Sequence, residues 1–81
     1  MKKRIVITYA ARDVDYYREF LFGIATSLDI ERFFAENFKQ NGKNTVEVLI
    51  ESPEDKVDSF IKIISSQFPE GVQIGGIRME E

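Results

Sequence analysis

The sequence predicts a two-layer α+β fold in which two helices cover one face of a four-stranded antiparallel sheet. The 81 residues alternate between strand-like and helix-like hydrophobic spacing, in the order β-α-β-β-α-β. An Asn-Gly pair separates the two middle strands, and this pair is typical of a tight hairpin. Right-handed β-α-β crossovers would then place both helices on the same face of the sheet.

The first half of the chain predicts a strand, a loop, a helix and a second strand. Residues 3–10 are rich in β-branched and apolar side chains, and residues 11–15 form a loop. Apolar side chains recur at helical spacing from about residue 15 to 28, although Gly23 lowers the stability of this helix by up to about 1 kcal/mol. Aromatic residues at 31–39 favour a strand, and their irregular alternation is compatible with a bulge. One face of the first strand has Ile5, Ile7 and Tyr9, and the other has Val6 and Thr8.

The second half predicts a hairpin, a helix and a final strand. Asn41-Gly42 forms the turn, and Thr45 to Glu51 alternates cleanly as a strand. Ser52 is a suitable helix cap and Pro53 a suitable first helical residue, so a helix begins here and ends before Pro69. The last strand covers residues 71–80, and its hydrophobic phase shifts at Gly75-Gly76 as a bulge would shift it. This arrangement is the ferredoxin-like sandwich, a fold that serves many functions.

Composition limits the chemistry that is open to this chain. Residues 1–81 are expected to form a single domain. Without cysteine or histidine, the chain has no thiol chemistry, no Ser-His-Asp triad and no ordinary zinc site. A net charge of −3 and a pI near 5.0 argue against binding to nucleic acid or to anionic membranes. No apolar run approaches the roughly 20 residues that span a bilayer, and we expect a cytoplasmic protein.

The join between the first strand and the first helix is the candidate functional region. A helix N-terminus presents free backbone N–H groups and a positive dipole end, and both favour an anion. Arg18 lies in the first turns, where its planar fork suits the same anion. Asp13 and Asp15 flank this position and would repel an anion. They are most simply explained as helix N-caps, with an Asp-x-Asp site for Mg²⁺ or Ca²⁺ as the alternative.

This region and much of the remaining chain resemble the acylphosphatase family. The family signature is a strand, a Val-Gln-Gly-Val-x-Phe-Arg loop and a helix with apolar residues at set distances. Val14-Asp15-Tyr16-Tyr17-Arg18 occupies the end of that loop, while Ala11-Arg12-Asp13 replaces the Val-Gln-Gly of the family. The family spacing beyond the arginine is matched by Phe20, Ala25, Leu28 and Ile30.

The resemblance implies a small hydrolase of acyl phosphates that uses no metal or cofactor. Arg18 and the backbone amides of the loop would bind the phosphate, and an asparagine on the second strand would position the attacking water. Ungapped counting from Arg18 reaches Glu36, and a shift of one residue makes this asparagine Asn37. The expected ligand is a small acyl phosphate or phosphate, held by the loop of Asp13, Val14, Asp15, Tyr16, Tyr17 and Arg18.

The sequence is also compatible with other functions. The aspartates of the loop also fit a domain of the same fold that is catalytically inactive and binds a protein or a small ligand. Arg18 equally fits a surface residue paired with Asp13 or Asp15, or with Glu36. An RNA-recognition domain has the same strand order, but the third strand has two acids and no aromatic residue. We expect a monomer or a weak homodimer, whose association surface would include some of Phe22, Phe33 and Phe38.

Overall fold

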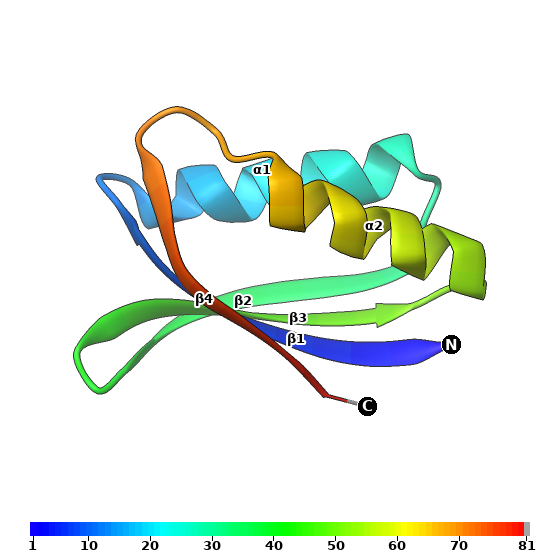
Figure 1. The fold of residues 1–81 in the computed structure, drawn as a ribbon, viewed down its shortest axis with the longest axis horizontal. Coiled ribbons are helices and arrows are strands. Elements are labelled where there is room, and N and C mark those ends of the chain that lie inside the picture. Colours follow the sequence, from blue (N-terminus) through cyan, green and yellow to red (C-terminus); the bar gives the residue numbers. More distant parts are fainter. Residues whose placement is uncertain (81) are drawn as a thin grey trace.

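The computed structural model describes residues 1–80 and confirms the predicted order of elements (Figure 1). The four strands form one antiparallel sheet in the order β2-β3-β1-β4, and the two helices lie over one face of it, leaving the other face uncovered (Figure 1). The fold is therefore a ferredoxin-like α+β sandwich. Its elements are β1 (Lys2–Ala11), α1 (Val14–Ser27), β2 (Arg32–Gln40), β3 (Lys43–Glu51), α2 (Glu54–Ser66) and β4 (Val72–Glu80).

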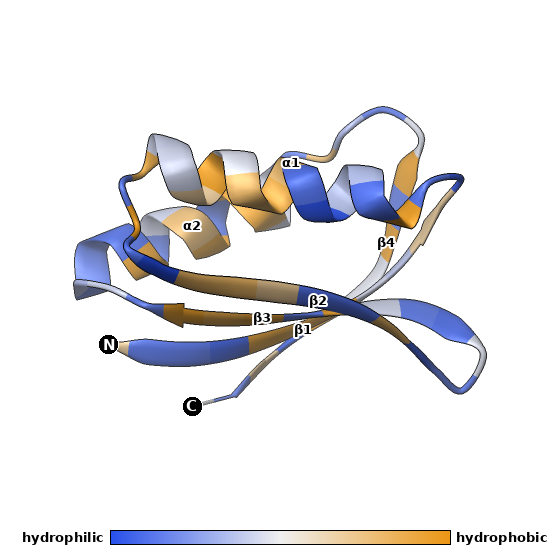
Figure 2. Cartoon of the chain, turned by 180° about the vertical axis from the view of Figure 1, so that it is seen from behind, coloured by the Kyte–Doolittle hydropathy of each residue, from blue (hydrophilic) through white to orange (hydrophobic). Residues whose placement is uncertain are grey.

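Both layers contribute to the core. In the sheet, every second residue of β1 and β3 points toward the helices, as the period of a strand requires. In Figure 2 the hairpin between β2 and β3 is mainly hydrophilic, whereas the strands beneath the helices are hydrophobic along much of their length. The fully buried apolar or aromatic side chains are Ile5, Ile7, Tyr17, Leu21, Val46, Val48, Val57, Phe60 and Ile64.

The sheet corrects one predicted bulge and confirms the other. β2 pairs with β3 in one continuous register from Arg32 to Gln40, so the bulge expected in residues 31–39 is absent. In β4 the register against β1 shifts between Thr8 and Tyr9, which leaves Gly75 as the extra residue, as the phase change predicted. A Cβ atom on Gly75 would lie 3.4 Å from the Thr8 carbonyl oxygen, so the backbone of this extra residue packs directly on β1.

The turns and helix ends follow local chemistry, with one correction. Asn41 and Gly42 both have positive φ, as a two-residue hairpin turn requires. The prediction that Ser52 caps α2 is wrong, because Pro53 is the N-cap and makes no side-chain bond. The Ser52 backbone pairs instead with the start of the chain: its N–H donates to the Met1 carbonyl at 3.1 Å, and its carbonyl accepts from the Met1 ammonium at 3.0 Å.

Within residues 1–80, no helix combines the length and the apolar character needed to cross a membrane.

Candidate functional site

The N-terminus of α1 is capped by the side chain of Asp13. Asp13 has an extended backbone, and its carboxylate Oδ1 accepts a hydrogen bond from the Asp15 N–H at 3.0 Å. Asp15 lies in the first turn, where a negative charge complements the helix dipole. The capping interpretation is therefore confirmed for Asp13 and wrong for Asp15, which lies inside the helix. The Asp13 carboxylate uses one of the amide groups that would otherwise be free to bind an external anion.

Arg18 lies one turn further along α1 and points to the edge of the sheet. It is half-buried, and its Nη1 donates to the carbonyl oxygen of Ala35 on β2 at 3.3 Å. Its Cζ atom lies 5.6 Å from the centroid of the Phe22 ring, a cation–π distance. The expected pairing with Asp13, Asp15 or Glu36 is wrong: within residues 1–80 no carboxylate lies within ion-pair distance of Arg18.

Asn37 faces the helices, whereas Glu36 points to the uncovered face of the sheet. The alternation of β2 places Phe33, Ala35 and Asn37 on one side. Without a bulge, it is the ordinary strand period that turns Asn37 inward and Glu36 outward. Of the two residues that counting from Arg18 left open, the structure therefore brings Asn37 to the side of α1.

Three matched contacts align α1 with β2 and bring the predicted site residues together. Successive turns of the helix present Val14, Arg18 and Phe22 on one stripe. Asn37 Nδ2 donates to the Val14 carbonyl at 3.1 Å, Arg18 bonds Ala35, and the Phe22 and Phe33 rings lie 5.0 Å apart. Ala35 and Asn37 are two residues apart on one strand, which is about 7 Å along β2. Arg18, which bonds Ala35, and Asn37 therefore occupy neighbouring places in this corner.

Tyr9 holds Asn37 in place and was not among the residues predicted for the site. Its hydroxyl lies 2.5 Å from Asn37 Oδ1 and 3.3 Å from the Val14 carbonyl. Since a hydroxyl donates one hydrogen, the shorter contact takes it, and the Asn37 amide group then donates to Val14. The sequence placed Tyr9 on the same strand face as Ile5 and Ile7, and its position just before the loop was the available signal.

Two tyrosines in this region have raised pKa values. Burial is the main cause that raises the pKa of Tyr9, and the negative charges of Asp15 and Asp13 add to it. Burial, with a smaller effect from Tyr9, raises the pKa of Tyr17 to about 12. The Tyr17 hydroxyl is also the buried side-chain polar atom that, within residues 1–80, has no hydrogen-bond partner.

The remaining predicted residues of the loop lie in different environments. The side chains of Asp13, Asp15 and Tyr16 are exposed, Val14 is half-buried, and Tyr17 is buried. Tyr17 therefore serves the core, and any contact that residues 13–17 make with an anion would involve backbone amides or exposed side chains. Among residues 1–80, no group of three or more potential metal-ligating side chains gathers in one place.

Solved structures with this fold include natural proteins and designed proteins. Acylphosphatase from Bacillus subtilis has a TM-score of 0.70 and 20% sequence identity, covering 98% of this chain and 81% of that one. Full-length HypF in a phosphate- and nucleotide-bound form has a TM-score of 0.64 and 20% identity, covering 98% of this chain and 10% of that one. The de novo designed protein Foldit4 has a TM-score of 0.67 and 14% identity, covering 100% of this chain and 98% of that one.

These likenesses show the fold alone. No protein-family model matches the chain, and no curated protein matches it significantly. A designed protein shares the fold about as closely as the two natural ones do, so fold likeness by itself assigns no activity. The chain has an acylphosphatase-like fold, and its predicted site residues Arg18 and Asn37 meet at the corner between α1 and β2.

Proposed function

We propose that the chain is a small acylphosphatase-like hydrolase that cleaves acyl phosphates at the corner between α1 and β2. The observation that carries this proposal is the placement of Arg18 beside Asn37, where no carboxylate of residues 1–80 pairs with the guanidinium. The fold likeness to acylphosphatase is consistent with it.

Arg18 would be the main phosphate ligand. A guanidinium has five N–H donors, and the Ala35 carbonyl occupies one of them through a hydrogen bond of 3.3 Å. The other donors can make two parallel bonds to phosphate oxygens. Free amides in the first turn of α1 would add to this binding, and together these donors would stabilise the charge that develops in the transition state.

Asn37 would align the attacking water. Its Oδ1 accepts one hydrogen bond from Tyr9 and keeps a second lone pair for the water. In the proposed reaction this water attacks phosphorus in line, the bond between phosphorus and the carboxyl oxygen breaks, and a carboxylate and inorganic phosphate leave. The reaction as proposed requires neither a metal nor a covalent intermediate.

A second candidate function is binding without turnover, and the Asp13 cap favours it. The Asp13 carboxylate already accepts from the Asp15 amide, where a phosphate oxygen would bind. At about 5 Å and an effective dielectric constant near 20, repulsion of one phosphate charge by this carboxylate is on the order of 3 kcal/mol. A domain with this loop would bind a protein or a ligand with less negative charge.

Hydrolysis of a generic acyl phosphate in EDTA distinguishes the two candidates. The wild-type chain is compared with Arg18→Ala and Asn37→Ala, and Arg12→Ala serves as a control because it removes an exposed cation from the same loop. If the proposal holds, turnover is lost with Arg18→Ala, falls at least about 100-fold with Asn37→Ala and persists with the control.

A phosphate titration followed by amide resonances is the complementary measurement. Shifts at residues 13–18 in the wild-type chain, lost in Arg18→Ala, would support phosphate binding at this corner. If the wild-type chain shows neither turnover nor such shifts, the hydrolase proposal is refuted and the binding function remains.

A further inference from the structure

The uncovered face of the sheet has an ordered arrangement of side chains that the proposed hydrolase site does not use. Pairing across the strands places these side chains in rows, each running from β2 through β3 and β1 to β4. The row through the middle of the face is Glu36, Glu47, Val6 and Arg78. Its neighbours are the row Phe34, Leu49, Arg4 and Glu80 and the row Phe38, Thr45, Thr8 and Gly76. A shorter row at the edge contains Arg32, Glu51 and Lys2.

Charge divides this face into two unlike halves. In these rows the half formed by β2 and β3 contains three carboxylates and one guanidinium, so negative charge is in excess. The half formed by β1 and β4 contains three cations and one carboxylate, so positive charge is in excess. Two ion pairs cross the middle of the sheet, Arg4 with Glu47 and Lys2 with Glu51, while Arg4 also pairs with Glu80 within its own half.

Glu36 is left without a cation in this arrangement. It lies directly opposite Glu47 on the neighbouring strand, and like charges in opposed positions destabilise a sheet. No cation of residues 1–80 lies within ion-pair distance of Glu36. A cation from outside the molecule would therefore be favourable at this position.

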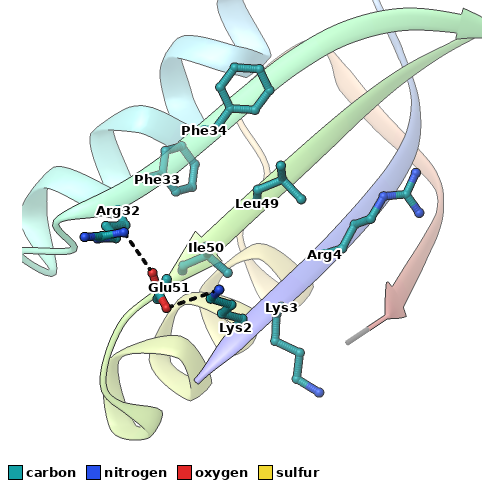
Figure 3. Close-up of a pocket in the computed structure, with 9 residues that line it drawn as sticks. All are labelled: Lys2, Lys3, Arg4, Arg32, Phe33, Phe34, Leu49, Ile50 and Glu51. Atoms are coloured by element: carbon teal, nitrogen blue, oxygen red, sulfur yellow. Dashed lines mark ion pairs between the residues drawn. The ribbon is translucent and has the colours of Figure 1, made fainter.

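Side-chain size divides the face in the same way. Phe34, Phe38 and Leu49 on β2 and β3 are 47%, 39% and 42% exposed. The corresponding places on β1 and β4 include Thr8 and Gly76, which rise little above the sheet. At one end of the face, Phe34 and Leu49 line a hollow of about 470 Å³. In Figure 3, Glu51 lies there between Arg32 and Lys2, with which it forms ion pairs. Arg4 lies on the side of Leu49 that faces away from Phe34 (Figure 3).

We infer that this face binds a second copy of the chain, with the two sheets stacked about a two-fold axis parallel to the strands. Such an axis reverses each row, so that β2 lies over β4 of the second copy and β3 lies over β1. Glu36 then meets Arg78 of the second copy, and Phe38 lies over the flat surface at Gly76. Each contact occurs twice, and the half with excess negative charge covers the half with excess positive charge.

The size of the face predicts weak association. Strand spacing and rise give an area of about 500 Å² for four rows on four strands. This is below the roughly 800 Å² per partner of a standard stable interface. We expect a dimer that forms at high micromolar concentration rather than a permanent one, with sheets about 10 Å apart and strands within about 30° of each other.

Charge reversal tests the geometry of this dimer by sedimentation velocity from about 10 µM to 1 mM at low salt. Glu36→Arg and Arg78→Glu should each raise the dissociation constant at least about tenfold, because each turns two symmetric attractions into repulsions. An equimolar mixture of the two variants should associate again, since a mixed dimer has opposite charges at both contacts. The double variant should also recover association for the same reason.

Two further variants complete the test. Gly76→Val should weaken association while the monomer stays folded, because a Cβ atom at Gly76 has no atom within 4 Å and its φ is not positive. Glu19→Arg changes the charge of the molecule as much as Glu36→Arg does, but at an exposed position on α1, and should leave association unchanged. A monomeric wild-type chain at 1 mM would overturn the inference. So would single variants that associate like the wild type, or a mixture that stays monomeric.

Discussion

Removing the hydroxyl group from each of two neighbouring tyrosines should change the free energy of unfolding in opposite directions. The Tyr9 and Tyr17 rings lie 4.8 Å apart in one core, so Tyr9→Phe and Tyr17→Phe test the same surroundings. The Tyr17 side chain is fully buried and its hydroxyl has no partner within residues 1–80. The Tyr9 hydroxyl donates to Asn37 Oδ1 at 2.5 Å.

The expected magnitudes follow from these contacts. An unpaired buried polar group costs about 1–3 kcal/mol, and the void left by the Tyr17 oxygen is smaller than a methyl group, which costs less than about 1 kcal/mol. Tyr17→Phe should therefore raise the free energy of unfolding by about 1 kcal/mol. Tyr9→Phe leaves Asn37 Oδ1 without its donor and should lower the free energy of unfolding by about 1–2 kcal/mol.

Urea unfolding followed by circular dichroism measures both variants. The two variants should differ from each other by about 2–3 kcal/mol, which corresponds to roughly 8–24 °C in Tm for a domain of this size. Equal slopes against urea would show that the variants differ in stability rather than in compactness. If Tyr17→Phe destabilises the chain by more than about 1 kcal/mol, its hydroxyl has a partner, such as a buried water, and the reasoning is refuted.

The remaining predictions concern pH, a helix end and the loop. The pKa of Tyr17 is raised to about 12 in the folded chain, while the unfolded value is about 10, so the folded chain keeps this proton to higher pH. The free energy of unfolding should therefore fall between about pH 10 and 12. Urea denaturation at a series of pH values should show a smaller fall for Tyr17→Phe than for the wild type. Asp29 follows the C-cap of α1 and has a φ of 57°, a left-handed conformation that glycine adopts freely. Asp29→Gly should therefore raise the free energy of unfolding, measured with urea, by roughly 0.5–1 kcal/mol. Gly42→Ala, at a φ of 76°, should lower it by about 1 kcal/mol, and an effect of the same sign at both positions would contradict this account. Asp13→Asn keeps a capping oxygen but removes the charge, so phosphate should bind at least about tenfold more tightly by calorimetry, and unchanged affinity would argue against phosphate at this corner.

Local sequence chemistry determined most of the fold. Hydrophobic spacing set the six elements to within a few residues, because strand and helix periods require different faces to be apolar. Asn41-Gly42 determined the hairpin through its positive φ angles, and the change of hydrophobic phase at Gly75-Gly76 located the bulge in β4. Asp13 was correctly predicted as a cap, because its carboxylate bonds the N–H of Asp15, only two residues further along the chain. The prediction of Ser52 as a cap was wrong. The backbone of Ser52 pairs with Met1, a contact between distant residues that no local pattern shows.

The tertiary structure decided how the candidate site is connected. That Arg18 contacts the Ala35 carbonyl rather than an aspartate depends on the alignment of α1 with β2, which crosses from one layer to the other. The regular register of β2, and not a bulge, turned Asn37 toward Tyr9 and Glu36 toward the uncovered face. These contacts join residues 17 to 28 positions apart in the sequence, where no local period applies. Sequence patterns specify which face each residue occupies along its own element, whereas packing and sheet pairing select the residues that meet across elements.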